Sequence, residues 1–209
     1  MPEARGRVSA VLLAAGSGSR FGGGKLLAPY RERPLIESSL ANLIGAPVDE
    51  TLVVVGDGAE RLGPVVEPYG VRVVENPEWE EGQSTSVRAG LLALGPEVGA
   101  AVVLLADQPL VGPEAVGRLV AAFEEGAEVA VATYGGERRN PVLFSRQVWP
   151  LLLRELAGDE GARAVLRRHP HLVREVPCDG VGDPADVDTV EDLRALERVR
   201  EGERRFKIG

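Results

Sequence analysis

Apolar residues along this chain occur either in short continuous runs or at helical spacing within longer segments. The short runs predict strands at Val8–Ala14, Thr51–Val55, Val71–Val74 and Ala100–Leu105, with further strand candidates at Glu128–Thr133, Pro141–Phe144 and Leu172–Val176. Helical spacing and helix-start signals predict helices at Leu35–Leu43, Ser84–Leu94, Pro113–Phe123, Val148–Leu156, Ala162–Arg168 and Val190–Arg200.

Strands that alternate with helices predict βαβ units, and hence an α/β fold with three α/β/α layers. We expect a Rossmann-like, mostly parallel sheet with helices on both faces. The run Ala100–Leu105 is apolar at every position, which is typical of a strand buried on both faces. Leu172–Val176 alternates like an edge strand. We predict one domain over residues 7–200, with loose tails at 1–6 and 201–209.

Composition narrows the possible functions. The 209 residues are 44% hydrophobic and 27% charged, as in ordinary globular proteins, and the net charge of −8 argues against non-specific nucleic-acid binding. No apolar stretch approaches the roughly 20 residues of a membrane helix. The apolar run at residues 8–15 is too short for a secretory signal. The single Cys178 fits a reducing compartment, so we expect a cytoplasmic protein.

A Gly-rich loop follows the first predicted strand and holds five glycines within residues 16–24. Glycines let backbone amide groups cradle phosphates, and Arg20 and Lys25 add positive charge. Lys25 is one of only two lysines among 24 basic residues. The alternative is a flexible surface loop. Leu26 excludes the P-loop pattern Gly-Lys-Ser/Thr, and Phe21 breaks the dinucleotide pattern G-x-G-x-x-G.

Two acidic positions are candidates for a metal site. Asp107 follows the buried strand Ala100–Leu105, at the strand end where ligands bind in open parallel sheets. Asp188 precedes the last predicted helix. Mg²⁺ prefers one or two carboxylates together with phosphate oxygens. Alternatively, Asp107 caps a turn, and the second acidic segment forms a helix start with Thr189 as the cap.

The loop resembles the signature of the MobA-like nucleotidyltransferases, and the resemblance spans about residues 8–198. The matching residues are Leu13-Ala14-Ala15-Gly16-Ser17-Gly18-Ser19-Arg20-Phe21-Gly22, followed by Lys25-Leu26-Leu27. Ala15, the Asn76–Gly90 segment with Trp79, and the Gly158–Arg163 element are most similar to the molybdenum cofactor cytidylyltransferase branch. Trp79 is then either a core aromatic residue or part of a pterin site.

The resemblance implies a role for each matching position. It implies Lys25, Arg20 and Asp107 as catalytic residues, and Asp107 and Asp188 as Mg²⁺ ligands, with Asp186 as the alternative to Asp188. The implied nucleotide-binding residues are Leu13, Ala14, Ala15, Gly16, Ser17, Gly18, Arg20, Lys25, Gly82, Ser84 and Ser86. Helix capping is the alternative role for at least one hydroxyl among residues 84–86.

Three positions depart from the family pattern: Ala106 and Arg139 replace Gly, and Val190 replaces Pro. Arg139 lies on the implied acceptor side. His169 and His171 lack zinc spacing and are expected at the surface.

The expected activity is Mg²⁺-dependent transfer of CMP from CTP to the phosphate of molybdopterin, with release of pyrophosphate. The expected partners are the nucleoside triphosphate, this acceptor, and a molybdoenzyme or its maturation chaperone. The alternatives are a guanylyltransferase, another NTP transferase with a different phosphate acceptor, and a non-catalytic nucleotide-binding protein on the same fold.

Overall fold

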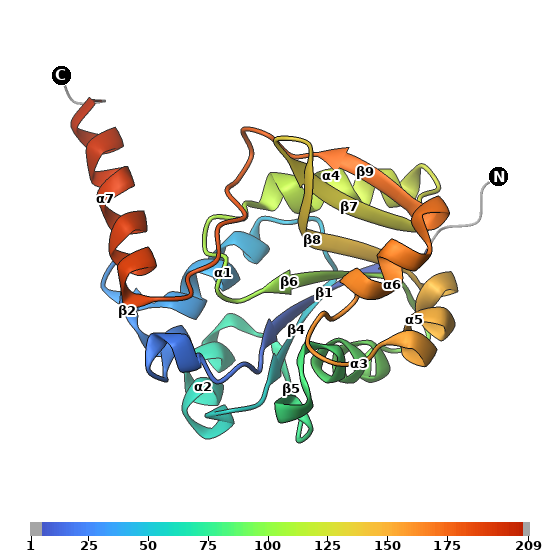
Figure 1. The fold of residues 1–209 in the computed structure, drawn as a ribbon, viewed down its shortest axis with the longest axis horizontal. Helices are drawn as coiled ribbons and strands as arrows, with labels where there is room; N and C mark the ends of the chain where they lie inside the picture. Colours follow the sequence, from blue (N-terminus) through green and yellow to red (C-terminus); the bar gives the residue numbers. More distant parts are fainter. Residues whose placement is uncertain (1–5, 207–209) are drawn as a thin grey trace.

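Strand β1, Arg7–Ala14, lies inside a seven-stranded sheet in the computed structural model, which describes residues 6–206, with side chains described up to residue 198. The strands run in the order β5-β4-β1-β6-β8-β7-β9 across the sheet (Figure 1). Their bounds are β4 Glu50–Val55, β5 Arg72–Glu75, β6 Val98–Leu105, β7 Val129–Tyr134, β8 Glu137–Ser145 and β9 Val173–Pro177. A separate pair of short strands, β2 (Pro29–Tyr30) and β3 (Arg33–Pro34), follows the Gly-rich loop.

Within the seven-stranded sheet, neighbouring strands are parallel except where β8 pairs with β6 and with β7. β8 follows β7 through the two-residue turn Gly135-Gly136, whose φ angles are 58° and 78°. Positive φ at both central residues is typical of a tight hairpin, whose strands are antiparallel. The predicted mostly parallel sheet is confirmed, and this hairpin accounts for the exception.

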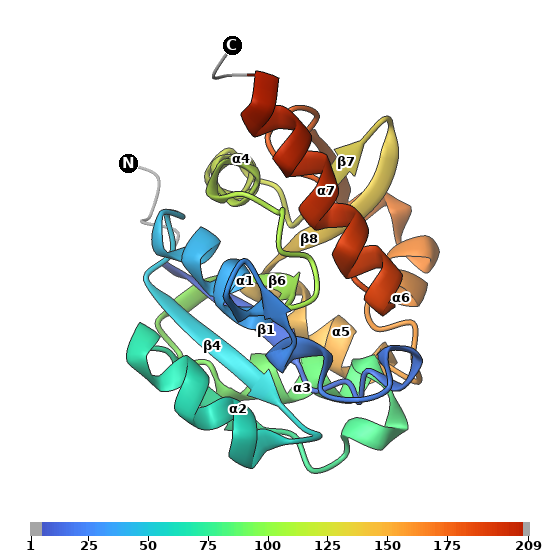
Figure 2. The same ribbon diagram turned by 90° about the vertical axis from the view of Figure 1, so that its left-hand side faces the viewer.

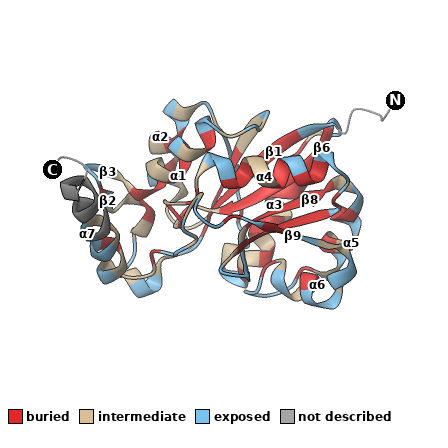
Figure 3. Cartoon of the chain, turned by 90° about the horizontal axis from the view of Figure 1, so that it is seen from above, coloured by how far each residue is buried: buried red, intermediate tan, exposed pale blue. Residues whose placement is uncertain are grey.

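Side chains of β1 face the two sides of the sheet in turn. Ala10 and Leu12 belong to one buried cluster, whereas Val11 and Leu13 belong to the other. The first cluster includes residues of α1, α2, α4 and the start of α7, and the second includes residues of α3, α5 and α6. The helix bounds are α1 Leu35–Ile44, α2 Ala59–Val66, α3 Gln83–Ala93, α4 Pro113–Glu124, α5 Trp149–Glu155, α6 Arg163–Arg168 and α7 Val190–Phe206. The predicted three-layer α/β/α arrangement is thereby confirmed, with the central strands β1 and β6 buried between the helices (Figure 3).

The edge where the parallel strands end carries the segments that matter for function. The Gly-rich loop follows β1 there, and α7 begins at the same edge (Figure 2). Backbone hydrogen bonds fix neighbouring strand ends to each other. The Ala106 amide donates to the Leu13 carbonyl oxygen at 3.0 Å, and the Asn76 amide donates to the Val55 carbonyl oxygen at 2.8 Å.

Two helices differ from the sequence predictions. α2 lies in a segment where no helix was predicted, because its Gly63-Pro64 pair is typical of turns and interrupts the helical pattern. α7 extends to Phe206, past the predicted end at Arg200, so residues 201–206 continue the helix instead of forming a loose tail. Residues 1–5 and 207–209 of the predicted tails lie outside the described residues. Within the described part of the chain, no helix is long and apolar enough to cross a membrane.

Cys178 gives the stability of this fold a predictable pH dependence. Its side chain is fully buried, and burial raises the pKa of the thiol. A raised folded-state pKa stabilises the fold below the unfolded value of about 8.5, and the stabilisation is lost as pH rises through the folded pKa. We therefore expect Cys178→Ala to lose less stability than the wild type between about pH 8 and 10 in urea unfolding. Equal losses in the two proteins would contradict this prediction.

Candidate active site

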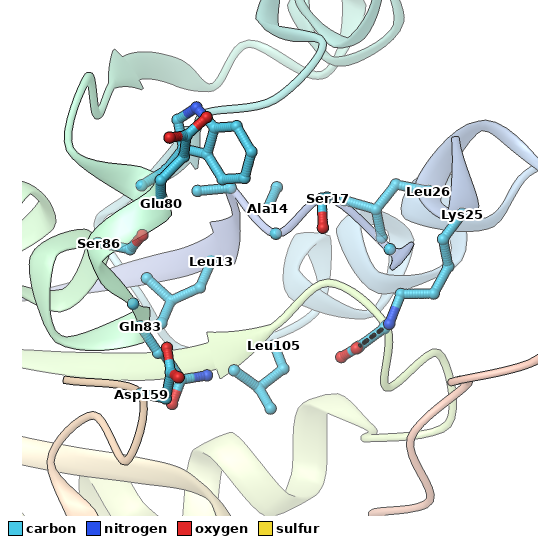
Figure 4. A pocket seen from close by; sticks show the side chains of 16 residues that line it. Leu13, Ala14, Ser17, Lys25, Leu26, Glu80, Gln83, Ser86, Leu105 and Asp159 are labelled. Atoms are coloured by element: carbon cyan, nitrogen blue, oxygen red, sulfur yellow. Dashed lines mark hydrogen bonds and ion pairs between the residues drawn. The ribbon is translucent and has the colours of Figure 1, made fainter. Parts of the chain in front are cut away.

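A pocket opens at the edge of the sheet where β1 and β6 end, between the Gly-rich loop and the start of α3 (Figure 4). Its volume of about 320 Å³ lies within the range of small-molecule sites. The residues that line it are Leu13, Ala14, Ala15, Gly16, Ser17, Gly18, Lys25, Leu26, Trp79, Glu80, Gly82, Gln83, Ser86, Leu105, Asp107 and Asp159. The pocket thus lies where ligands bind in open parallel sheets, beyond the carboxyl ends of the strands.

The first part of the Gly-rich loop presents backbone amide groups to the pocket. The amides of residues 16, 17 and 18 donate no hydrogen bond to any described residue. The later part is shaped by two 3-10 turns, Ser19–Phe21 and Lys25–Leu27, which use their own carbonyl groups as acceptors. Consecutive open N–H groups beside a lysine can bind an anion such as a phosphate chain.

Lys25 folds back against the loop and reaches two carboxylates. A Cβ at Gly18, whose φ is 62°, would lie 2.9 Å from Cβ of Lys25, so a larger residue there would displace the lysine. Nζ of Lys25 donates to Oδ2 of Asp107 at 2.6 Å and lies 3.6 Å from Oδ1 of Asp188. The Lys25 side chain is only 12% exposed, so solvent screens this ion pair less than a surface pair.

The acidic segment before α7 is brought to β6 by the backbone. The Val187 amide donates to the carbonyl oxygen of Asp107 at 2.9 Å, and Asp188 then faces the Gly-rich loop. Arg20 completes the arrangement, because its Nη1 donates to Oδ2 of Asp188 at 2.5 Å. The Arg20 side chain is 76% exposed and lies outside the pocket lining. The structure therefore joins Arg20, Lys25, Asp107 and Asp188 in one cluster of alternating charge.

Gln108 is a part of the site that sequence reasoning missed. Its buried side-chain amide donates to the Pro184 carbonyl oxygen at 2.9 Å and to Oδ1 of Asp186 at 2.8 Å. Partial burial of its carboxyl group and the nearby Asp107 carboxylate raise the pKa of Asp186, although the residue as a whole is exposed. Asp186 thus points at Gln108, whereas Asp188 points at Lys25. The sequence carried no signal for this contact, because 76 positions separate Gln108 from Pro184.

The start of α3 forms the opposite wall. Gly82 is the N-cap residue of α3 and makes no side-chain cap. Ser86 lines the pocket, and its Oγ accepts a hydrogen bond from Nδ2 of the Asn76 side chain at 3.0 Å. Ser84 is buried and absent from the lining, and its backbone amide donates to the carbonyl oxygen of Gly158 at 3.2 Å. Of the predicted nucleotide-binding residues, Ser84 and Arg20 are the two outside the pocket lining.

Trp79 and Asp159 also line the pocket. From the sequence, Trp79 had two alternative roles, and Asp159 was covered only as part of the Gly158–Arg163 element. The remaining candidates lie elsewhere. Arg139 is exposed on β8 and pairs with Glu137 at 2.5 Å. His169 lies 3.1 Å from Glu155, and neither residue lines the pocket.

The donor set fits a hard divalent cation. Asp107 and Asp188 converge on one positive charge, the Lys25 ammonium, and present carboxylate oxygens, the ligands that Mg²⁺ and Mn²⁺ prefer. No group of three or more His, Cys, Asp or Glu side chains within the described residues is arranged to hold a metal on its own. Two carboxylates complemented by ligand phosphates match the sites in which Mg²⁺ keeps most of its other ligands as water or phosphate.

The chain is similar in sequence to known proteins. Residues 10–173 match the MobA-like NTP transferase domain. Nicotine blue oxidoreductase of Paenarthrobacter nicotinovorans is 34% identical over 199 residues, which cover 90% of this chain and 96% of that protein. Purine catabolism protein PucB of Bacillus subtilis is 31% identical over 200 residues, which cover 90% and 95%.

The chain is also similar in fold and in sequence to solved structures. Rv0371c from Mycobacterium tuberculosis has a TM-score of 0.82 and 31% identity, covering 93% of this chain and 100% of that one. Its complex with manganese has a TM-score of 0.78 and 30% identity, covering 92% and 98%. A nucleotidyl transferase from Methanothermobacter has a TM-score of 0.76 and 25% identity, covering 92% and 96%.

The loop geometry predicts unequal effects for two glycine substitutions. Gly18 and Gly24 have φ angles of 62° and 65°, but a Cβ at Gly24 would meet no atom within 4 Å. Both Gly18→Ala and Gly24→Ala should therefore cost about 1–2 kcal/mol for the left-handed backbone, measured by urea unfolding. Only Gly18→Ala should also displace Lys25 and weaken binding of inorganic triphosphate, by roughly tenfold in calorimetry. Equal binding by the two variants would contradict the packing argument.

Proposed function

Because this chain belongs to the MobA-like NTP transferase family, we propose that it transfers CMP from CTP to the phosphate of molybdopterin and releases pyrophosphate. Family membership makes it a nucleotidyltransferase, and the base and the acceptor are what the proposal adds. Two features support the cytidylyl assignment: Trp79 and Asp159 belong to segments that resemble the molybdopterin cytidylyltransferase branch, and both line the pocket.

The observation that carries the proposal is the cluster at the loop end of the pocket. Lys25 lies between Asp107 and Asp188, beside the open backbone amides of residues 16–18. A triphosphate needs amide donors, a lysine and a divalent cation together. The loop amides, Lys25 and two carboxylates that would hold such a cation meet at one place. A surface loop with incidental glycines does not require Lys25 to turn back toward two carboxylates.

In the proposed reaction, an oxygen of the acceptor phosphate attacks the α-phosphorus of CTP. The bond to the oxygen that bridges the α- and β-phosphates breaks, and pyrophosphate leaves. No covalent enzyme intermediate is needed, so the protein acts by positioning and charge stabilisation. Lys25 offsets the negative charge at the α-phosphate and leaving group, Arg20 holds the outer phosphates, and the amides of residues 16–18 bind phosphate oxygens.

Asp107 and Asp188 would hold the divalent cation, with Mg²⁺ as the proposed metal. The manganese complex of Rv0371c, which is 30% identical, supports the binding of a divalent metal by this protein. When bound, such a cation neutralises phosphate charge and orients the phosphates for in-line displacement. Asp186 is a weaker candidate, because Gln108 already bonds to its carboxylate.

The proposal also covers the acceptor site, the partners and the cellular location of the protein. We place the acceptor toward the β7–β8 hairpin, where Arg139 departs from the family pattern. The proposed partners are a molybdoenzyme or its maturation chaperone, which would receive the product. We propose one catalytic domain over residues 7–200 and a cytoplasmic location, where CTP and Mg²⁺ are available.

The direct test is pyrophosphate release with each of CTP, GTP, UTP and ATP, with Mg²⁺ and molybdopterin. Release only with CTP and molybdopterin supports the proposal. Release with GTP indicates a guanylyltransferase, and release with a different phosphate acceptor indicates another transferase. Tight nucleotide binding without release indicates a non-catalytic binding protein.

The name of one relative, nicotine blue oxidoreductase, favours a redox reaction as a second candidate activity. The loop argues against a dinucleotide, because Phe21 occupies the last glycine position of the G-x-G-x-x-G pattern. Loss of absorbance at 340 nm with NADH or NADPH and an organic dye acceptor, in the absence of CTP, would support that second activity.

Lys25→Ala should lower kcat by about 10²–10³, because it removes one donor that stabilises the transition state. The pyrophosphate-release assay with CTP, Mg²⁺ and molybdopterin measures this loss of turnover. Arg118→Ala, which removes a partly exposed positive charge from α4 outside the pocket lining, is the matched control and should retain its turnover. Melting curves of both variants show whether they fold. Unchanged turnover in folded Lys25→Ala would exclude the proposed role.

Metal binding distinguishes the two aspartates. Asp188→Asn should weaken Mn²⁺ binding in the presence of CTP by at least roughly tenfold, because a carboxylate ligand is lost. Asp186→Asn should have a smaller effect, since Asp186 is held by Gln108. Electron paramagnetic resonance of free Mn²⁺ measures both affinities. A larger effect of Asp186→Asn would identify Asp186 as the ligand.

A further inference from the structure

The pocket has two chemically different ends. At one end, Lys25 donates to Asp107, and Arg20 lies just beyond on Asp188. At the other end, the start of α3 meets a second loop, and the side chains there are Gln83 and Asp159. Figure 4 shows Gln83 and Asp159 together, on the opposite side of the pocket from Lys25, with Leu105 between the two ends.

The second loop, Gly158–Gly161, joins α5 to α6 and packs tightly on the N-terminus of α3. The Ser84 amide donates to the carbonyl oxygen of Gly158 at 3.2 Å. A Cβ at Gly82, where φ is 112°, would lie 2.5 Å from Oδ1 of Asp159 and 2.7 Å from the carbonyl carbon of Gly158. No larger residue fits at Gly82 without moving this loop. The close approach therefore fixes where the Asp159 carboxylate enters the pocket.

The neighbouring side chains hold the same contact from the other side. A Cβ at Gly161 would lie 2.5 Å from Oε1 of Gln83, so the Gln83 side chain packs directly on the loop. Glu160 points elsewhere and pairs with Arg167. Asp159 itself makes no hydrogen bond or ion pair with any described residue, although it lines the pocket. A carboxylate in this position accepts hydrogen bonds and offers no donor.

Electrostatics orients a nucleotide in this pocket. The triphosphate carries several negative charges, which Asp159 and Glu80 repel and which Lys25 and Arg20 attract. The phosphates therefore lie at the Lys25 end, and the base lies at the Asp159 end. Trp79, which lines the pocket, offers an aromatic face on which a base can stack.

We propose that Asp159 determines base specificity by accepting a hydrogen bond from the exocyclic amino group of the base. The inference rests on the proposed function, in which the base is cytosine and the group is its N4 amino group. Asp and Glu side chains pair with cytosine N4 in this way. Uracil presents the acceptor O4 at the same place, so a carboxylate opposite it repels the base. Asp159 thus selects an amino-bearing base over uracil.

The test compares the affinities for CTP and UTP with Mg²⁺ and without acceptor, by calorimetry. The wild type should bind CTP more tightly than UTP. Asp159→Asn should lower this preference by about 10-fold to 100-fold, because an amide makes a weaker bond to N4 and can donate to O4 of uracil. Asp159→Ala should lower the CTP affinity and leave the UTP affinity equal or improved, because no acceptor remains.

The controls separate this role from general effects of charge. Glu160→Gln removes the same charge from the adjacent position, outside the pocket lining, and should keep the wild-type preference. Lys25→Ala should weaken CTP and UTP alike, because phosphates are common to both. Equal binding of CTP and UTP by the wild type, or an unchanged preference in both Asp159 variants, would overturn the proposal.

The outcomes also separate this inference from the proposed function. A wild type that prefers GTP, and loses that preference in Asp159→Asn, supports amino-group recognition and overturns CTP as the donor. A wild type that transfers CMP while its Asp159 variants change only the KM of the acceptor overturns the inference and leaves the proposed function standing.

Discussion

Two carboxylates held close together repel each other unless a positive charge lies between them, and the site is built around this requirement. Asp107 comes from the end of a central strand, and Asp188 comes from the segment before the last helix. Lys25 satisfies both, at 2.6 Å and 3.6 Å, and it reaches them because the loop after β1 turns back at Gly18. Three stretches of chain that are far apart in sequence are thereby joined at one point. The long loop keeps a defined shape because Lys25 is attached to the sheet edge.

The sheet supplies the rigid frame for this charge cluster. Alternate residues of β1 enter the two hydrophobic clusters, so the strand that carries the Gly-rich loop is fixed from both faces. β6 is equally buried and ends just before Asp107. Functional groups on strand ends are held more firmly than groups on free loops. Such firm placement favours a reaction whose rate depends on the positioning of the reacting groups. Other parts of the pocket, including Asp159, come from loops that pack on this frame.

The sequence predicted the frame better than the contacts within it. Continuous apolar runs located the central strands, and the residue types after β1 and β6 located Lys25 and Asp107, because strand ends in a parallel sheet share one edge. α2 was missed, since Gly63-Pro64 interrupts its pattern. Gln108 and Asp159 were missed as site residues for another reason. Their roles depend on tertiary contacts with segments about 76 residues away, at Pro184 and Gly82, and no local pattern encodes such a contact.

The hairpin of β7 and β8 bears on how such an enzyme can diversify. β8 runs against the direction of β6, so its first residues, from Glu137, lie at the same edge as Asp107, where the parallel strands end. The turn Gly135-Gly136 is exposed, and it is held to the rest of the chain by the Gly135 amide, which donates to Oδ1 of Asp179 at 2.7 Å. Exposed hairpin tips tolerate changes in length and side chain. Evolution can therefore vary this exposed tip independently of the ion-paired cluster, so that lineages which keep the cluster can differ in the acceptor that we propose binds near the tip.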